Sequence, residues 1–135
     1  MTESSRASAI ITAALLDTAA VVVFVLIGRR SHTEGLDLSG VWGTAWPFIA
    51  ALGVGWVVAR AWRHPLAVWP VAVVIWAVTV CGGMLLRAVS AQGTDPAFVI
   101  VAATVLAIFL MGWRLAAWLV ATLVRRRSRV NAVDA

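Results

Sequence analysis

Long apolar runs separated by short polar segments make up almost the whole chain. The runs cover residues 9–28, 41–59, 66–86 and 97–124, and each approaches or exceeds the roughly 20 residues that a membrane-spanning helix needs. They are continuously apolar, whereas the strands of a membrane barrel alternate lipid-facing and lumen-facing residues. We therefore predict an all-α integral membrane four-helix bundle, one domain over residues 1–135, with helices at about 9–28, 46–61, 66–87 and 97–124.

The segments between the runs set the expected arrangement of the helices. The second helix should start near Trp46, because proline, here Pro47, is well tolerated only in a first helical turn. Residues 60–65 form a tight connection, so the second and third helices should be antiparallel neighbours. The first run continues through Gly28 beyond a set of small residues, which predicts an uncleaved helix instead of a signal peptide.

Composition and charge support a membrane protein and indicate its orientation. The chain is 62% hydrophobic, more than the half or so found in soluble domains, and all eleven cationic residues are arginine. With both termini inside, Arg29, Arg30 and Arg87 lie outside. The seven arginines on the cytoplasmic side are then Arg6, Arg60, Arg63, Arg125, Arg126, Arg127 and Arg129. This bias predicts an N-in, C-in topology, with the lipid bilayer as the first partner.

Asp17 and Arg114 are the only charged residues inside the runs. Each is expected near the bilayer midplane, where an ionisable group costs at least about 2.5 kcal/mol and marks a candidate functional site. Helical spacing places both charges on faces of mostly small residues, Asp17 with Ala13, Ala20 and Phe24, and Arg114 with Ala103, Ala107, Ala117 and Ala121. We therefore predict an Asp17–Arg114 ion pair between helices. The pair either only fixes which helices face each other, or it acts in function, with Asp17 titrating or balancing an anionic substrate held by Arg114.

Small residues also predict where the helices pack closely. Gly55 and Ala59 recur at four-residue spacing with Gly53 beside them, and Gly83 lies on a similar face of the third helix. These faces pack within the bundle or between copies of the protein. Of the eight tryptophans, four are expected at the membrane boundaries. The other four are expected deeper, where they pack between helices or line a pocket, and packing is favoured. The boundary set is Trp42, Trp46, Trp62 and Trp69, and the deeper set is Trp56, Trp76, Trp113 and Trp118.

Residue counts exclude several classes of function. The chain has no lysine for a retinal Schiff base, and neither His32 nor His64 lies in a helix core where it could hold haem or zinc. Asp17 is the only acid at depth, so the paired carboxylates of an aspartyl protease are missing. The lone Cys81 has no disulfide partner. Nucleic-acid binding would need a basic face on a soluble domain, and the sequence predicts no such domain. We also expect no enzyme activity, no catalytic residue, no metal and no cofactor.

Several short motifs together resemble an uncharacterised family. They are Asp17 with the segment 23–32, Ala45-Trp46-Pro47-Phe48, Gly55-Trp56, Gly83-Met84-Leu85-Leu86-Arg87, and Phe109-Leu110-Met111-Gly112-Trp113-Arg114. Over about residues 14 to 116 the chain is similar to the small four-helix membrane proteins grouped as domain of unknown function 3054, typical of high-GC bacteria. The resemblance implies a four-helix membrane fold in the cytoplasmic membrane of a bacterium and no particular activity. It also implies that Asp17, Arg29, Arg87 and Arg114 belong to one polar site.

Two functions fit the sequence. One is a small transporter or permeation protein that uses the buried Asp17 and Arg114. The other is a non-catalytic accessory or assembly subunit of a larger membrane complex, in which the pair is structural and the small-residue faces dock a partner. A homo-oligomer or a membrane protein partner is expected in both cases, because four helices alone rarely enclose a pathway.

Overall fold

The described part of the chain, residues 2–31 and 35–133 of a computed structural model, is helical and contains no strand. Its elements are α1 (Glu3–Ser31), α2 (Leu38–Val58), a wide turn η1 (Val68–Ala72), α3 (Val73–Val89) and α4 (Pro96–Val133). Four helical segments are long and apolar enough to cross a membrane. The predicted all-α four-helix membrane bundle is therefore confirmed, while His32 and Glu34 lie outside the described residues.

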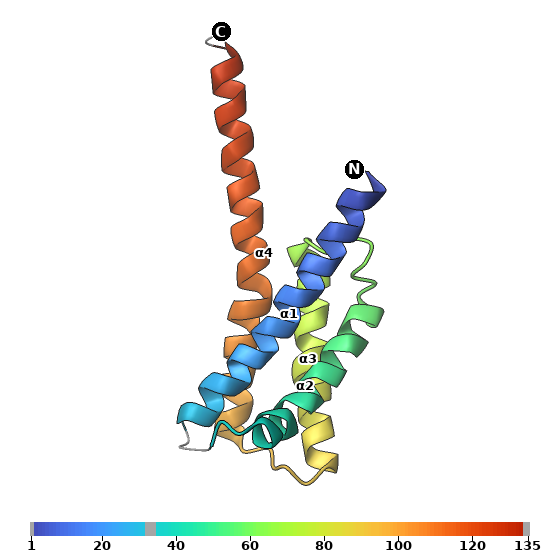
Figure 1. Cartoon of the computed structure of the whole chain (residues 1–135), viewed down its shortest axis with the longest axis vertical. Helices are drawn as coiled ribbons and strands as arrows, with labels where there is room; N and C mark the ends of the chain where they lie inside the picture. Colours follow the sequence, from blue (N-terminus) through green and yellow to red (C-terminus); the bar gives the residue numbers. More distant parts are fainter. Residues whose placement is uncertain (1, 32–34, 134–135) are drawn as a thin grey trace.

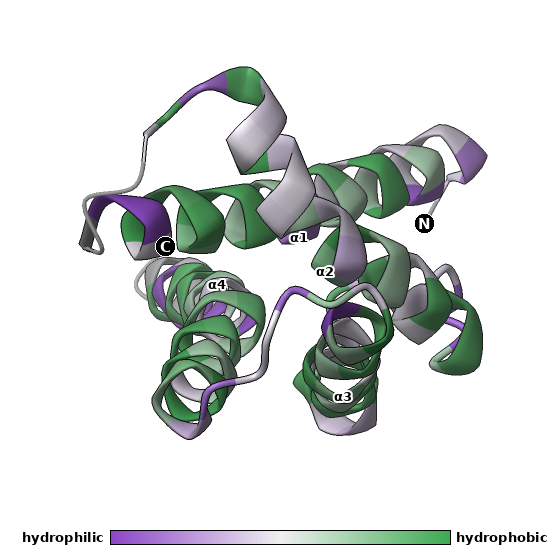
Figure 2. Cartoon of the chain, turned by 90° about the horizontal axis from the view of Figure 1, so that it is seen from below, coloured by the Kyte–Doolittle hydropathy of each residue, from purple (hydrophilic) through white to green (hydrophobic). Residues whose placement is uncertain are grey.

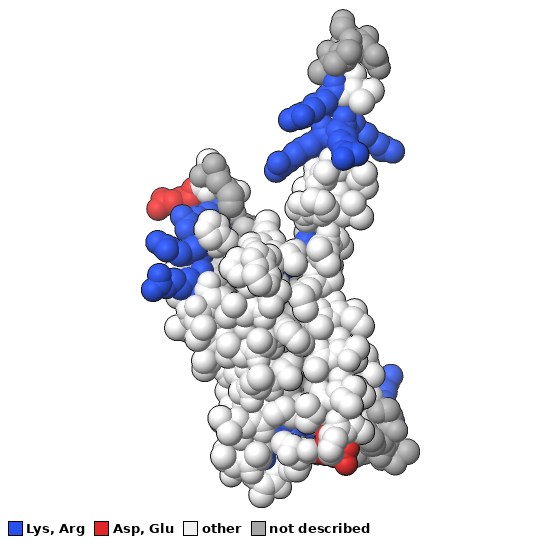
Figure 3. Space-filling view, turned by 180° about the vertical axis from the view of Figure 1, so that it is seen from behind, with Lys and Arg blue, Asp and Glu red and all other residues white. Residues whose placement is uncertain are grey.

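The two ends of the bundle differ. Both termini and the α2–α3 connection lie at one end, which we call the terminal end, and the α1–α2 and α3–α4 connections lie at the other, the loop end (Figure 1). Seen from the loop end, the helices surround a common core (Figure 2). On the face seen in Figure 3, most charged side chains lie at the two ends, and a wide band that is almost free of charge separates them. Such a band is the surface that a bilayer requires.

The second helix begins at Leu38, so the prediction of a start near Trp46 was wrong. Asp37 caps the helix, because its Oδ2 accepts a hydrogen bond of 2.9 Å from the backbone N–H of Gly40. Pro47 consequently lies inside α2. A proline ring crowds the carbonyl one turn earlier and removes one backbone hydrogen bond, which bends a helix. Figures 1 and 2 show that α2 changes direction along its length.

The third and fourth helices also differ from the predicted bounds. Regular α3 starts at Val73, not at residue 66. Trp69 has an extended backbone (φ −110, ψ 135), as expected of a residue that precedes a proline. Helix α4 continues to Val133 instead of ending at residue 124, because no glycine or proline follows Gly112 to stop it.

Helices α2 and α3 share the most extensive contact in the bundle. Gly55 lies so close to α3 that an added Cβ would stand 3.2 Å from both the Cα and the carbonyl oxygen of Ile75. Gly83 receives the ring of Phe48, whose Cδ1 would stand 2.5 Å from an added Cβ. Gly53, in contrast, is exposed and has no neighbour within 4 Å of that position. The prediction that Gly53 is a packing position was therefore wrong for contacts within this chain. Ala59 is half-buried and packs against the core.

The helix faces that form the core agree with the prediction for α1 and differ from it for α4. Ala13, Asp17 and Phe24 are buried on α1. On α4 the buried positions besides Arg114 are Ala102, Leu106 and Leu110, each at four-residue spacing. The predicted face was wrong, since Ala103 and Ala107 are only half-buried and Ala117 and Ala121 are exposed. Trp118, predicted to pack between helices, is 63% exposed because α4 extends past the bundle there.

The α2–α3 contact yields a matched pair of substitutions. Gly55→Leu should lower the free energy of unfolding by about 1–3 kcal/mol, because its side chain meets backbone atoms that cannot move away. Gly53→Leu on the same helix should leave stability unchanged or slightly raised, since leucine favours helix over glycine. Thermal unfolding of both variants in one detergent measures the difference. Equal stability of the two variants would contradict the close packing at Gly55.

Candidate functional site

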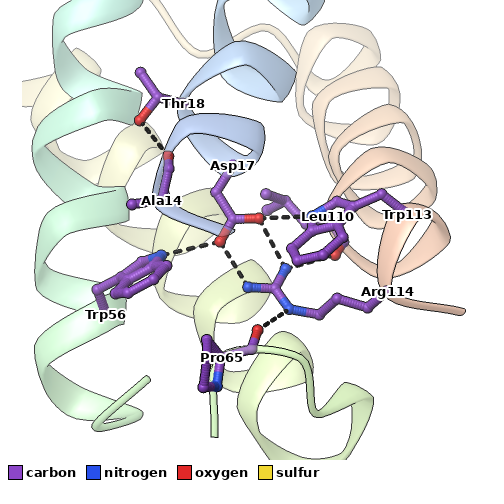
Figure 4. A network of polar contacts seen from close by, with 8 residues as sticks. All are labelled: Ala14, Asp17, Thr18, Trp56, Pro65, Leu110, Trp113 and Arg114. Atoms are coloured by element: carbon purple, nitrogen blue, oxygen red, sulfur yellow. Dashed lines mark hydrogen bonds and ion pairs between the residues drawn. The ribbon is translucent and has the colours of Figure 1, made fainter. Parts of the chain in front are cut away.

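Asp17 and Arg114 form the ion pair predicted from the sequence (Figure 4). Arg114 Nη1 donates to Asp17 Oδ1 at 2.8 Å, and Nη2 donates to Oδ2 at 2.7 Å. Both side chains are 0% exposed. This two-bond geometry is the strongest arrangement available to a guanidinium and a carboxylate, and it offsets part of the cost of removing both charges from water.

Two tryptophans complete the surroundings of the carboxylate. The indole N–H of Trp56, from α2, donates to Asp17 Oδ2 at 2.9 Å. The indole N–H of Trp113, from α4, donates to Oδ1 at 2.9 Å. Each carboxylate oxygen therefore accepts one bond from arginine and one from tryptophan. A carboxylate with four such donors is well satisfied despite its burial.

Arg114 also binds two backbone carbonyls. Its Nε donates to the carbonyl oxygen of Pro65 at 3.0 Å, and its Nη1 donates to that of Leu110 at 2.8 Å. Its guanidinium carbon lies 4.3 Å from the centre of the Trp113 ring, which adds a cation–π contact. The polar network thus ties α1, α2 and α4 to the α2–α3 connection (Figure 4).

The contact with Pro65 places the ion pair near the terminal end of the bundle core. Trp56 lies close to the end of α2, and Pro65 belongs to the connection that follows it. Ala61 and Pro65 in this connection are themselves buried. The pair therefore lies level with the end of α2 and the α2–α3 connection, while its expected depth near the bilayer midplane stays a prediction.

Arg29 and Arg87 do not join the ion pair, contrary to the single polar site implied by the family resemblance. Arg29 lies 12 residues beyond Asp17 on the same helix, which is about 18 Å at 1.5 Å per residue. Both arginines instead line a cavity at the loop end of the bundle. The four residues therefore form two separate groups, one at each end of the core.

Thr79 lies between the two groups. It is fully buried on α3, and its Oγ1 has no hydrogen-bond partner among the described residues. By helical spacing it lies one turn from Ile75, which packs on Gly55, and one turn from Gly83, which packs on Phe48. Thr79 thus faces the core between the level of the ion pair and that of Phe48.

The network holds three helices and the α2–α3 connection together. No group of three or more potential metal ligands occurs in the described part of the chain. The carboxylate of Asp17 is saturated by four donors and so is not positioned to act as a base on another molecule. Trp56, Trp113 and the Pro65 carbonyl were not predicted as partners of the pair. The adjacency of Trp113 to Arg114 was the one sequence signal for them.

The tryptophan contacts predict the effect of a single lost hydrogen bond. Trp56→Phe keeps the ring and removes only the N–H donor to Asp17, so it should lower the free energy of unfolding by about 1.5–3 kcal/mol, as expected for a bond to a charged group. Trp118→Phe removes the same donor from an exposed position and should change stability little. Unfolding in detergent compares the two. A Trp56→Phe variant as stable as Trp118→Phe would contradict the four-donor arrangement.

Comparisons with known proteins identify a family and no activity. Residues 14–124 match the family model described as Protein of unknown function (DUF3054). Neither the curated proteins nor the solved structures contain a match to the chain. The matched segment contains α2, α3 and most of α1 and α4, together with the Asp17–Arg114 pair, Arg29 and Arg87. With its four membrane-spanning segments, the chain is a multi-pass membrane protein that belongs to the DUF3054 family.

Proposed function

We propose that the protein is a small transporter or permeation protein in the cytoplasmic membrane of a bacterium. The observation that carries the proposal is a cavity of about 580 Å³ that enters the bundle at the loop end and reaches the buried Phe24. Asp17 lies two turns from Phe24 toward the start of α1, a distance of about 10 Å at 1.5 Å per residue. A solute path would need only the short core segment between them to open.

The residues between the cavity and the ion pair suit such a path. Phe24, Phe48 and Phe98 form a layer with ring centres 5.3 to 6.2 Å apart, which closes the inner end of the cavity. Beyond this layer lies Thr79, whose hydroxyl has no partner in the described chain. The Asp17–Arg114 network then closes the terminal end. In this mechanism the phenylalanine layer and the ion pair are two gates in series, and the pair opens when its bonds to the α2–α3 connection break.

The arginine distribution sets the direction of the proposed path. The N-in, C-in topology predicted from the arginine bias puts the terminal end in the cytoplasm. The cavity then opens to the outside, and the closed ion pair faces the cell interior. The structure would correspond to an outward-open state of the transporter.

An accessory or assembly subunit is the alternative, and the length of α4 favours it. Residues 97–124 carry no charge apart from Arg114 and span about 42 Å at 1.5 Å per residue, more than the roughly 30 Å of a hydrocarbon core. The C-terminal part of α4 stands apart from the bundle (Figure 1). Its side chains Leu115, Trp118 and Leu123 are all at least half exposed. A second membrane protein, or a second copy, would cover this segment. The ion pair would then be architectural.

Cysteine accessibility separates the two functions. We would replace Cys81 by serine and introduce Thr79→Cys, a change of similar size at the buried position between the gates. A water-soluble thiol reagent that cannot cross membranes is then applied to intact cells and to inside-out vesicles. In a transporter, the new thiol should react from the outside. The parent Cys81, exposed on the surface of α3, is the control for reaction at a lipid-facing site.

The same assay tests the ion pair as a gate. In a transporter, adding Asp17→Asn should increase the reaction rate from the cytoplasmic side about tenfold, the effect of losing only about 1.4 kcal/mol of closing free energy. No reaction from either side, with and without Asp17→Asn, would show a sealed bundle. That outcome would contradict the transporter proposal and favour the accessory subunit.

A further inference from the structure

The loop-end cavity has two arginines in its walls and aromatic rings at its base. It measures about 580 Å³, within the range of sites that hold small organic molecules. Its base is formed by Phe24, which is 2% exposed, and by the half-buried Phe98. Its mouth is formed by exposed residues of the α3–α4 connection, Gly93 and Asp95. The cavity is therefore polar where it meets solvent and apolar where it ends.

Arg29 is fixed in one wall of this cavity. Its Nε and Nη2 donate to the carbonyl oxygen of Gly35 at 2.9 and 2.7 Å, and its Nη1 donates to Thr44 Oγ1 at 3.1 Å. The side chain is only 12% exposed. A guanidinium held in this way keeps its charge inside the cavity wall and loses little conformational freedom when an anion binds.

Arg87 is fixed in another wall of the cavity. Its Nη1 and Nη2 donate to the side chain and backbone of Gln92, each at 3.1 Å, and its Nε donates to the Gly93 carbonyl at 3.3 Å. Its guanidinium carbon lies 4.5 Å from the centre of the Phe98 ring. A positive charge and an aromatic surface thus lie side by side.

The carboxylates in the described part of this region serve as helix caps. Asp95 lines the cavity, and its Oδ1 accepts a hydrogen bond from the backbone N–H of Ala97 at the start of α4. Asp37 lies 3.7 Å from Arg29, but its side chain is 62% exposed. The Ser39 hydroxyl and the Gly40 N–H hold the pKa of Asp37 below its usual value, which fits its place at the start of α2.

We propose that this cavity binds a small organic anion. Its carboxylate or phosphate group lies between Arg29 and Arg87, whose two positive charges attract it. Its apolar part rests on Phe24 and Phe98. If the protein is the proposed transporter, this anion is its substrate class, so the transport part rests on the proposed function. The binding part does not, because it requires only the cavity. The anion is a dissolved solute or the headgroup of an anionic lipid, and the experiment separates these sources.

Phenyl phosphate is a suitable probe, with benzyl alcohol as its neutral analogue. Purified full-length protein in nanodiscs of the zwitterionic lipid phosphatidylcholine is titrated with each compound by calorimetry. Phenyl phosphate should bind at least about tenfold tighter than benzyl alcohol. A tenfold difference in affinity is the smallest gain expected when a charged group replaces a neutral one in a charge-assisted contact. Equal binding of the two compounds, or no binding of either, would overturn the proposal.

A cavity-filling variant tests the location without removing any arginine. Gly43 lines the cavity, and an added Cβ there would meet nothing within 4 Å. Gly43→Leu should therefore fold and lower the affinity for phenyl phosphate at least about tenfold. Gly53→Leu, equally uncrowded but elsewhere on α2, is the control and should bind as the parent does. Equal affinity in Gly43→Leu and Gly53→Leu would place binding outside the cavity and overturn the proposal.

Charge variants and a change of lipid complete the test. Arg87→Gln should weaken phenyl phosphate binding as much as Gly43→Leu, and Arg30→Gln, at an exposed position next to Arg29, should not. If nanodiscs of anionic phosphatidylglycerol suppress binding in the parent, the anion site is supported and its ligand is a lipid headgroup. If binding persists there, the ligand is a solute. If phenyl phosphate binds but the thiol reagent does not label Thr79→Cys, the anion site is supported and the transport proposal is contradicted. The two proposals can therefore fail separately.

Discussion

A fully buried pair of charges, a carboxylate and a guanidinium, determines how this bundle is arranged. In an apolar surrounding, neither charge is tolerable alone, and each must find partners among the few polar groups within reach. Asp17 obtains them from Arg114, Trp56 and Trp113, and Arg114 obtains another from Pro65. Because these groups come from α1, α2, α4 and the α2–α3 connection, satisfying one pair fixes the relative positions of all of them.

Close packing fixes the rest of the bundle by a different physical means. Between α2 and α3 no buried ion pair is present in the described residues, and backbone approach at Gly55 and Gly83 brings the helices together. In a membrane, helices that approach this closely gain more van der Waals contact with each other than they would have with lipid chains. The result is a tightly packed terminal half that contains the ion pair. The loop half is more open, and its cavity ends at the phenylalanine layer.

The sequence was sufficient for the parts of the structure that rest on composition. Four apolar runs led to four helices, and the two isolated charges led to the Asp17–Arg114 pair, because an unpaired ion in such a chain has no stable alternative. The rotation of α4 was not predictable from small residues alone. Alanines mark close approach only where a neighbour is present, and the core of α4 is built from Leu106 and Leu110 instead.

The site was harder to predict than the fold because its partners carry no charge. A tryptophan is a core residue, a boundary residue or a hydrogen-bond donor depending on which way its helix faces, so Trp56 gave no distinct signal and Trp113 only its position next to Arg114. The Pro65 carbonyl is a backbone group and leaves no trace in the sequence. Arg29 and Arg87 were placed in one site with Asp17, whereas the straight course of α1 separates Arg29 from Asp17 by about 18 Å.

A double-mutant cycle on the ion pair tests the central claim most directly. The free energy of unfolding in detergent is measured for the parent, Asp17→Asn, Arg114→Gln and the double variant. Each single change should cost about 3–5 kcal/mol by leaving one buried charge unpaired, and the double variant should recover most of that loss. Single variants as stable as the parent, or costs that simply add in the double variant, would show that the bundle does not depend on this pair.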